Sequence, residues 1–365
     1  MELKIGRKEL TAALETTSSV VSTRPTLPIL GNVLIDVRKK DAVLSATDLE
    51  VGIVLSVPAE VKREGKLTVP ARKLLDIVRE LPGDSVSLET DAASRMLLKA
   101  GAVEIKLLGL APDEFPQLPE VKKEAEVKVA CATLAKMIDR TLYAVSNDET
   151  RYVLNGAYLV WEKSELKMVT TDGRRLSFIR AALEGTGGKG EAVVPTKALQ
   201  ELVHLFGSAE GEVTVVLGEG YAKFTVGSAT LTTRLIDGRF PDYEQVIPKA
   251  QDKKVTVATD AFLAATRRAA LIAADRSSSV RLDVRKGFIT FSAASHELGE
   301  AREEVPAAYD GESLSVAYNA RYLTDVLKHI ETKETLLELS TALAPGVLRP
   351  AGDETYVCVV MPIRL

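Results

Sequence analysis

Few residues in this 365-residue chain are suited to catalysis or metal binding. There are three histidines, His204, His296 and His329, and two cysteines, Cys131 and Cys358. None of them has the spacing of a zinc site or a CxxC motif, and no GxSxG or HExxH motif occurs. The carboxylates are spread along the chain without an isolated pair suited to acid and base catalysis. The sequence therefore predicts no catalytic residue, no metal site and no cofactor.

A different chemistry, attraction of a polyanion by cationic side chains, is indicated by a segment that occurs three times. Arg72, Lys197 and Arg321 occupy the same place in the three copies, at spacings of 125 and 124 residues. In each copy one face reads basic, acidic, then basic or His: Arg72/Asp76/Arg79, Lys197/Glu201/His204 and Arg321/Asp325/Lys328. Apolar residues recur three and four positions apart, as at Leu74 and Val78, which predicts amphipathic helices.

Two further landmarks repeat with nearly the same period. A second helix is expected before each first one, over residues 6–21, 132–146 and 260–276. Thr47-Asp48, Thr171-Asp172 and Ala294-Ser295 recur at spacings of 124 and 123 residues, each flanked by alternating, strand-like sequence. Each unit therefore reads helix, strands, helix, strands, which predicts an α+β fold of three tandem similar domains. Their expected bounds are 1–121, 127–249 and 253–365.

The charge is unevenly distributed. The chain carries 47 Lys and Arg against 51 Asp and Glu, a net charge of −4, which excludes DNA binding by bulk positive charge. The six expected helices together carry +4, so the remaining residues carry −8. Helix propensity alone could place Lys and Arg on helices, but with the repeat this split indicates a shared cationic surface for phosphates. Without a disulfide pattern, signal peptide or membrane span, a cytoplasmic protein is expected.

The order of several motifs resembles one family, the bacterial DNA polymerase III beta subunit, which is the replication sliding clamp. The motifs are Arg24-Pro-Thr-Leu-Pro-Ile-Leu-Gly-Asn32, Val69-Pro-Ala-Arg-Lys73, Thr171-Asp-Gly-Arg-Arg-Leu176, Asp237-Gly-Arg-Phe-Pro-Asp-Tyr243 and Val359-Val-Met-Pro-Ile-Arg-Leu365. The resemblance implies a noncatalytic processivity factor: a head-to-tail homodimer that forms a ring around double-stranded DNA, with helices inside and antiparallel sheets outside. Implied partners are the polymerase III alpha subunit, clamp-loader subunits, other polymerases and repair proteins, held through short linear motifs.

The resemblance also implies three sets of site residues. Sequence-independent DNA contacts are expected at Arg24, Arg72, Lys73, Arg151, Tyr152 and Lys197. A peptide-binding pocket is expected from Leu154, Thr171, Gly173, Arg174, Arg175, Leu176, Pro241, Val246, Asn319, Tyr322, Leu343, Val359, Val360, Met361, Pro362 and Arg364. The dimer interface is expected to pair Ile105 and Leu107 with Leu271 and Ile272 of the other copy.

Simpler interpretations stay open beside these. Arg72 and Lys197 could form i,i+4 ion pairs with Asp76 and Glu201. The pocket segment 357–363 could be an ordinary buried strand, and the interface residues could be ordinary core. At the level of function, the alternatives are a repeat-built scaffold that binds only proteins, and an enzyme with an unrecognised site.

Overall fold

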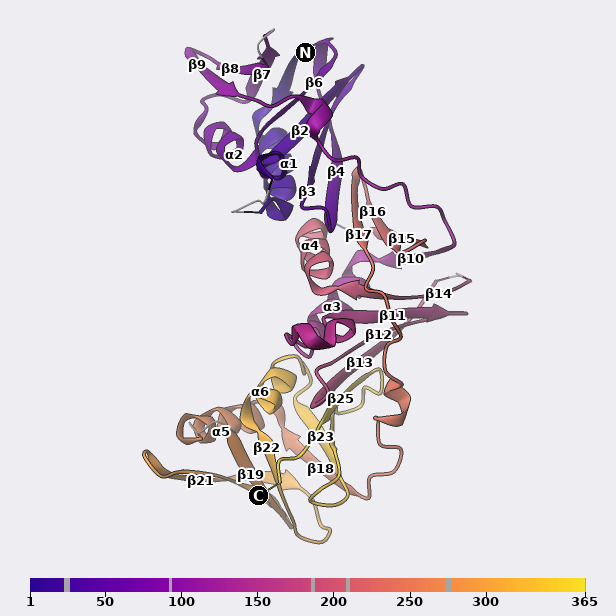
Figure 1. The fold of residues 1–365 in the computed structure, drawn as a ribbon. Coiled ribbons are helices and arrows are strands. Elements are labelled where there is room, and N and C mark those ends of the chain that lie inside the picture. Colours follow the sequence, from indigo (N-terminus) through magenta and orange to yellow (C-terminus); the bar gives the residue numbers. More distant parts are fainter. Residues whose placement is uncertain (23–26, 92–93, 185–187, 208–210, 274–277, 365) are drawn as a thin grey trace. The chain divides into compact units, whose positions relative to one another are not determined.

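The computed structural model describes residues 1–22, 27–91, 94–184, 188–207, 211–273 and 278–364 (Figure 1). The chain forms two compact units. Unit 1 consists of Met1–Ala135 and Leu183–Ile236, and unit 2 consists of Lys136–Ala182 and Asp237–Leu365.

The helices of the described residues follow the predicted repeat. They are α1 (Arg7–Val20), α2 (Ala71–Glu80), α3 (Cys131–Leu142), α4 (Thr196–Phe206), α5 (Thr259–Ile272) and α6 (Ala320–Lys328). Pro70 and Pro195 precede α2 and α4, where the missing proline N–H costs no helical hydrogen bond. Asn319 caps α6 instead, since its side-chain oxygen accepts from the backbone N–H groups of Arg321 and Tyr322 at 2.9 and 3.3 Å.

Unit 1 contains two antiparallel sheets. The first has the order β5 (Glu60–Arg63), β1 (Glu2–Gly6), β7 (Ser85–Thr90), β8 (Arg95–Ala100) and β9 (Val103–Leu108). The second has the order β10 (Ala125–Ala130), β15 (Glu212–Gly218), β16 (Tyr221–Val226), β17 (Ala229–Arg234), β4 (Val51–Pro58), β3 (Asp41–Thr47), β2 (Asn32–Arg38) and β6 (Gly65–Pro70). Strand β14 (Lys189–Pro195) also belongs to this unit.

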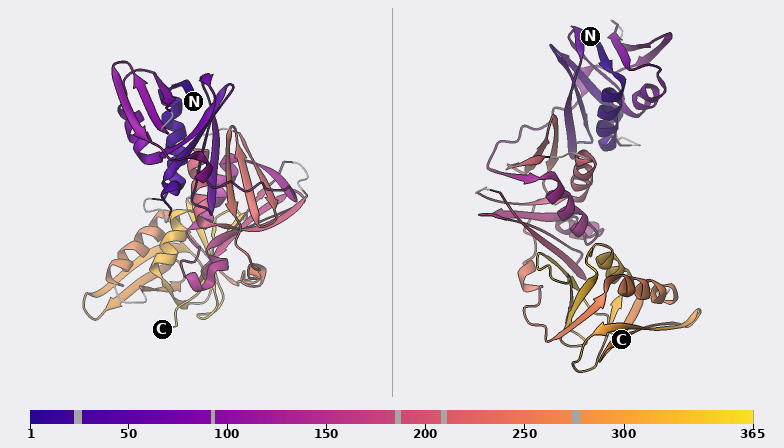
Figure 2. Two further views of the ribbon diagram at one scale, coloured as in Figure 1. Left: turned by 45° about the horizontal axis from the view of Figure 1, so that its top comes forward. Right: turned by 180° about the vertical axis from the view of Figure 1, so that it is seen from behind.

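The core of unit 1 lies between helices and sheets. Alternate residues of β1 and β8, such as Leu3 and Leu98, are buried and pack with Leu14 of α1 and Leu74 of α2. This alternation leaves the other face of the five-stranded sheet to solvent. Helices α1 and α2 contact one another, and the indigo and purple helices lie together in both views of Figure 2.

In unit 2 the strands form one continuous antiparallel series. Its order is β11 (Gly156–Glu162), β12 (Glu165–Thr171), β13 (Arg175–Ala182), β25 (Tyr356–Val360), β24 (Gly346–Pro350), β23 (Glu334–Leu339), β18 (Lys253–Ala258), β21 (Gly299–Ala308), β20 (Phe288–Ser295), β19 (Ser279–Arg285) and β22 (Leu314–Asn319). Helices α5 and α6 contact one another, and α5 packs on β20 and β21, where Phe262 meets Phe291 edge to face.

The order strand, helix, strands, helix, three strands thus recurs three times along the chain, which confirms the predicted α+β fold of three similar domains. Consecutive repeats share sheets. In unit 1, Ile53 of β4 pairs with Leu231 of β17, and in unit 2, Leu176 of β13 pairs with Val359 of β25. These shared sheets explain why the compact units cut across the repeats. The exact domain bounds 1–121, 127–249 and 253–365 stay predictions.

Candidate functional site

An apolar pocket in unit 2 is the main candidate site. It encloses about 130 Å³, and apolar cavities of about 150 Å³ accept a benzene-sized group. The space therefore suits an aliphatic or aromatic side chain. The lining residues come from the 3-10 turns η3 (Glu149–Leu154) and η4 (Tyr243–Gln245), from the turn between β12 and β13, and from the end of β25. They are Leu154, Thr171, Gly173, Arg174, Arg175, Leu176, Pro241, Tyr243, Val246, Val359 and Met361.

The turn between β12 and β13 is fixed by its own side chains. The Thr171 hydroxyl donates to the carbonyl of Arg175 at 2.6 Å, and Asp172 Oδ1 accepts from the N–H groups of Arg174 and Arg175 at 2.9 and 3.0 Å. Gly173 has a φ of 82°, a left-handed conformation that favours glycine. A Cβ atom at Gly173 would lie 2.8 Å from Nη1 of Arg151, so this guanidinium lies directly against the turn.

The same turn occurs in unit 1 at Thr47-Asp48, the first copy of the repeated Thr-Asp pair. Thr47 donates to the carbonyl of Val51 at 2.9 Å, and Asp48 Oδ1 accepts from the N–H groups of Glu50 and Val51 at 3.0 and 2.8 Å. Leu49 replaces the glycine and has a φ of 81°. The hydrogen-bond pattern of the two turns supports the repeat independently of the helices.

The surface beside the unit 1 turn is covered. In the first repeat, Gly52 occupies the position that Leu176 has in the second repeat. Leu118 likewise corresponds to Tyr243, because each follows a phenylalanine by three residues. A Cβ atom at Gly52 would clash with the side chain of Leu118. The glycine therefore allows this leucine to pack where unit 2 has its pocket.

Arg175 supports the wall of the unit 2 pocket, and its side chain is only 8% exposed. Its Nε atom lies 3.0 Å from Asp172 Oδ2, its Nη1 atom lies 2.8 Å from Asp325 Oδ2, and its Nη2 group donates to the carbonyl of Tyr143. The guanidinium lies over the rings of Tyr143 and Tyr322, at 5.5 and 4.6 Å from their centroids. These partners satisfy a buried charge that would otherwise be costly.

A buried polar cluster lies behind this arginine. The Tyr143 hydroxyl is 3.0 Å from that of Tyr356 and 3.1 Å from Sγ of Cys358. Burial raises the pKa of all three groups, those of the two phenols far above the ordinary value. All three stay protonated near neutral pH, and this thiol is therefore a poor nucleophile.

The structure brings together most of the predicted pocket residues but not all. Asn319, Tyr322, Leu343, Val360, Pro362 and Arg364 do not line the pocket, and their role stays a prediction. Asn319 caps α6 and Tyr322 stacks on Arg175. Tyr243 lines the pocket and was not predicted. The sequence does contain a signal for Tyr243, because it follows Phe240-Pro241 as Leu118 follows Phe115-Pro116, so the two residues occupy equivalent places in the repeat.

The expected DNA contacts lie on different elements. Arg72 and Lys73 are exposed on α2. Among the described residues, Arg72 forms no ion pair with Asp76 and Lys197 forms none with Glu201, so the i,i+4 pairs considered above are not present. Nη2 of Arg72 donates to the Val21 carbonyl at 3.3 Å, and Lys197 forms an ion pair with Asp48. Arg24 lies outside the described residues.

Two more expected DNA contacts, Arg151 and Tyr152, lie in η3 beside the pocket. Arg151 is exposed and lies against Gly173 of the pocket turn, as described above. Tyr152 is 51% exposed, and its hydroxyl donates to the Asp237 carbonyl. The structure therefore places both residues beside the pocket, and their contact with DNA stays a prediction.

The expected interface residues lie on surface elements. Ile105 and Leu107 are half-buried on β9, an edge strand of the five-stranded sheet. In the last turn of α5, Leu271 is 75% exposed and Ile272 is half-buried. Ile105 and Leu107 pack partly against the core of unit 1, whereas Leu271 is mostly exposed, so the interface role of all four stays a prediction.

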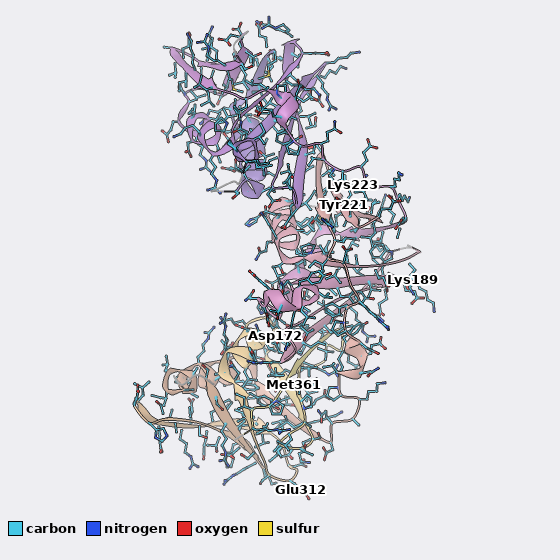
Figure 3. All side chains as sticks on the ribbon, in the orientation of Figure 1. Asp172, Lys189, Tyr221, Lys223, Glu312 and Met361 are labelled. Atoms are coloured by element: carbon cyan, nitrogen blue, oxygen red, sulfur yellow. The ribbon has the colours of Figure 1, made fainter. Side chains whose placement is uncertain are left out.

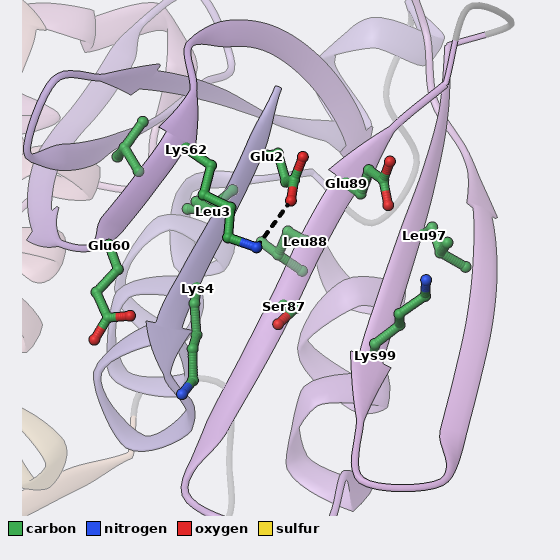
Figure 4. Close-up of a pocket in the computed structure, with 11 residues that line it drawn as sticks. Glu2, Leu3, Lys4, Glu60, Lys62, Ser87, Leu88, Glu89, Leu97 and Lys99 are labelled. Carbon is green, nitrogen blue, oxygen red and sulfur yellow. Dashed lines mark ion pairs between the residues drawn. The ribbon is translucent and has the colours of Figure 1, made fainter.

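A larger hollow of about 390 Å³ lies on the exposed face of the five-stranded sheet (Figure 4). Lysines and glutamates alternate around it, and Lys62 Nζ pairs with Glu2 Oε1 at 3.2 Å. Its lining mixes these charged side chains with Leu3, Val61, Leu88 and Leu97, and nothing in this arrangement indicates a particular ligand. The described residues contain no cluster of His, Cys, Asp or Glu able to hold a metal, and no helix among them is long and apolar enough to cross a membrane.

Comparisons with known proteins identify the family. Models of the DNA polymerase III beta subunit match in all three parts: the N-terminal domain over residues 1–119, the central domain over 128–242 and the C-terminal domain over 244–364. The chain belongs to the DNA polymerase III beta subunit family. Its function is that of a bacterial sliding clamp in DNA replication.

Individual relatives agree over the full length. A beta sliding clamp of Pseudomonas putida is 37% identical, with 100% of both chains covered. A crystal structure of the DNA polymerase III subunit beta from Pseudomonas aeruginosa has a TM-score of 0.97 at 35% identity, again with 100% of both chains covered. A structure of the clamp from the same species bound to griselimycin has a TM-score of 0.96 at 35% identity, with the same coverage.

Figure 3 labels Asp172, in the turn after β12, and Met361, which follows β25, both in unit 2. The N–H of Met361 donates to the carbonyl of Arg174 at 2.8 Å, which attaches the residue after β25 to the turn after β12. Two of the three repeats therefore contribute to one pocket.

Proposed function

We propose that two copies of the chain close head to tail into a ring around duplex DNA, and that the ring holds DNA by enclosing it. The edge strand β9 supports this proposal, because its outer backbone groups are open to pairing and Ile105 and Leu107, which pack partly against the core, keep some exposed apolar surface. Leu271 and Ile272 on α5 would supply the opposite surface. A head-to-tail interface of this kind forms a ring only if the rotation that relates one copy to the next returns to the first copy; otherwise the copies form an open filament.

Arg72, Lys73 and Lys197, with Arg24, would attract the phosphates from the inside of that ring. Such contacts carry no sequence information and are exchangeable, which suits a protein that slides. The net charge of −4 would oppose attachment to DNA elsewhere on the surface.

The pocket of unit 2 would tether partner proteins by short linear motifs. The observation that carries this proposal is an open apolar hollow with few polar groups, built on a turn fixed by Thr171 and Asp172. The partners would be the replicative polymerase, clamp-loader subunits, other polymerases and repair proteins. The chain itself would be noncatalytic and act in the bacterial cytoplasm.

Retention on circular DNA tests the ring. The protein is loaded by a clamp loader onto nicked circular DNA and passed over a sizing column, and the DNA is then linearised. A ring stays on the circle and is lost from the free ends of the linear form. Equal retention on both forms would contradict enclosure, and no retention on either would favour the protein-only scaffold.

A further inference from the structure

One end of the pocket in unit 2 is cationic. Arg151 and Arg174 are both exposed there, and Arg151 lies against Gly173. Arg174 lines the pocket and forms no ion pair with any residue that the structure describes. Asp148 Oδ2 lies 3.9 Å from Nε of Arg151, but both side chains are more than half exposed, so the carboxylate neutralises this arginine only weakly. A positive charge is therefore available at this rim.

The other end is acidic. Tyr243 lines the pocket there and stacks on Phe178, with ring centroids 5.8 Å apart. Phe178 lies on β13 three residues after Arg175, the first residue of that strand, or about 10 Å along it. Asp242 and Glu244 flank Tyr243 and are both exposed. Burial, together with the negative charges of Glu244, Glu165 and Asp242, raises the pKa of Tyr243 to about 12.

We propose that the pocket selects its peptide by the order of charges around the apolar anchors. The preferred peptide has an acidic side chain facing Arg151 and Arg174 and a basic side chain facing Asp242 and Glu244. This inference rests on the proposed peptide-binding function and adds the polarity of the bound segment. The reversed order places like charges together at both ends, which opposes binding in that orientation.

The test uses two fluorescently labelled peptides of identical composition. Both carry the same Leu and Phe anchors, and one has Asp before the anchors and Lys after them, while the other has the reverse. Their equal net charge removes any effect of the overall charge of the clamp. Fluorescence polarisation on the full-length protein should give about a threefold difference in Kd at low salt, since each exposed pair changes affinity by about 1.4- to 5-fold and the two peptides differ at both ends. Added salt should shrink the difference.

A double variant and a control variant test whether Arg151 and Arg174 cause the difference in affinity between the two peptides. Arg151→Gln combined with Arg174→Gln should reduce the difference between the peptides, because only the acidic end still discriminates between them. A third peptide with Ser at both charged positions measures any loss of affinity that follows from changing Arg174, which lines the pocket. Arg302→Gln is the matched control, because this exposed arginine lies on β21 and does not line the pocket.

The outcomes separate the two proposals. Equal affinity of the two charged peptides for the wild-type protein would overturn the charge-order inference and leave peptide binding intact. An order preference that is undiminished in the double variant would also overturn the inference. Failure of all three peptides to bind would overturn the proposed pocket function and the inference with it.

Discussion

Asp325 Oδ2 on helix α6 lies 2.8 Å from Nη1 of Arg175, so a residue of the third repeat fixes a pocket residue of the second. The same Arg175 is held by Asp172 and lies between two tyrosine rings. The shape of the pocket therefore depends on the packing of α6 against the strand that carries the pocket wall.

Asp325→Ala should weaken both stability and peptide binding. The buried guanidinium loses one of its two carboxylate partners, which costs about 1–3 kcal/mol. We expect a lower urea midpoint and a several-fold higher peptide Kd by fluorescence polarisation. Asp76→Ala is the matched control, because Asp76 holds the equivalent place on α2 and is exposed. Wild-type affinity in Asp325→Ala would show that Arg175 keeps its position without this carboxylate.

Deletion of residues 361–365 should abolish peptide binding. Met361 lines the pocket, and its N–H joins the segment to the Arg174 carbonyl at 2.8 Å. Fluorescence polarisation measures the loss, and circular dichroism checks that the strands remain. Retained affinity in a folded deletion variant would contradict the assignment of the pocket.

Arg72→Glu combined with Lys197→Glu should reduce clamp loading and the lifetime on circular DNA. The phosphates would meet negative charge, and the ion pair between Lys197 and Asp48 would be lost, at a cost of at most about 1 kcal/mol because Lys197 is partly exposed. A gel-shift or retention assay at moderate salt measures the effect. Unchanged loading would remove these two residues from the DNA surface, and Lys128→Glu with Arg302→Glu serves as the control.

The buried cluster of Tyr143, Tyr356 and Cys358 predicts a loss of stability at alkaline pH. Burial raises the pKa of each group, so the folded protein holds these protons more tightly than the unfolded chain. Stability is complete below the ordinary thiol value of 9.0 and falls as the pH rises above it. The thiol contributes up to about 1.4 kcal/mol per pH unit.

Cys358→Ala should make that alkaline fall shallower between pH 9 and 10, as followed by chemical unfolding at each pH. Cys131→Ala is a comparison of the same kind outside the cluster, because burial also raises the pKa of this thiol and a smaller change in the slope is expected. A wild-type slope in Cys358→Ala would show that other groups govern the alkaline transition.

Leu107→Asp or Leu271→Asp should shift the protein from dimer to monomer. A charge placed at the centre of an apolar interface must be desolvated without a partner. Sedimentation velocity measures the change, and Leu298→Asp is the control, since Leu298 is also exposed but lies in the turn between β20 and β21. A dimer that persists in both variants would move the interface elsewhere.

Local patterns in the sequence were sufficient for the helices and the repeat. The period of about 125 residues located α2, α4 and α6 within a few residues, because each depends on its own apolar face. The Thr-Asp landmark likewise marked a real turn, since Thr171 and Asp172 bond to residues within four positions.

Contacts between distant residues could not be predicted in this way. Lys197 pairs with Asp48, 149 residues away, and not with its helical neighbour Glu201. Tyr243 joins the pocket through a short 3-10 turn that has no periodicity to detect. The partners of Arg175 come from three separate segments, and only the tertiary structure brings them together.

The composition of the pocket also has a consequence for synthesis. Leu154 is translated more than 200 residues before Val359 and Met361. A nascent chain still on the ribosome therefore displays the polar turn without its complete apolar floor. If the pocket binds partners as proposed, a polypeptide that ends before Met361 would lack part of the binding surface and would compete poorly with finished molecules.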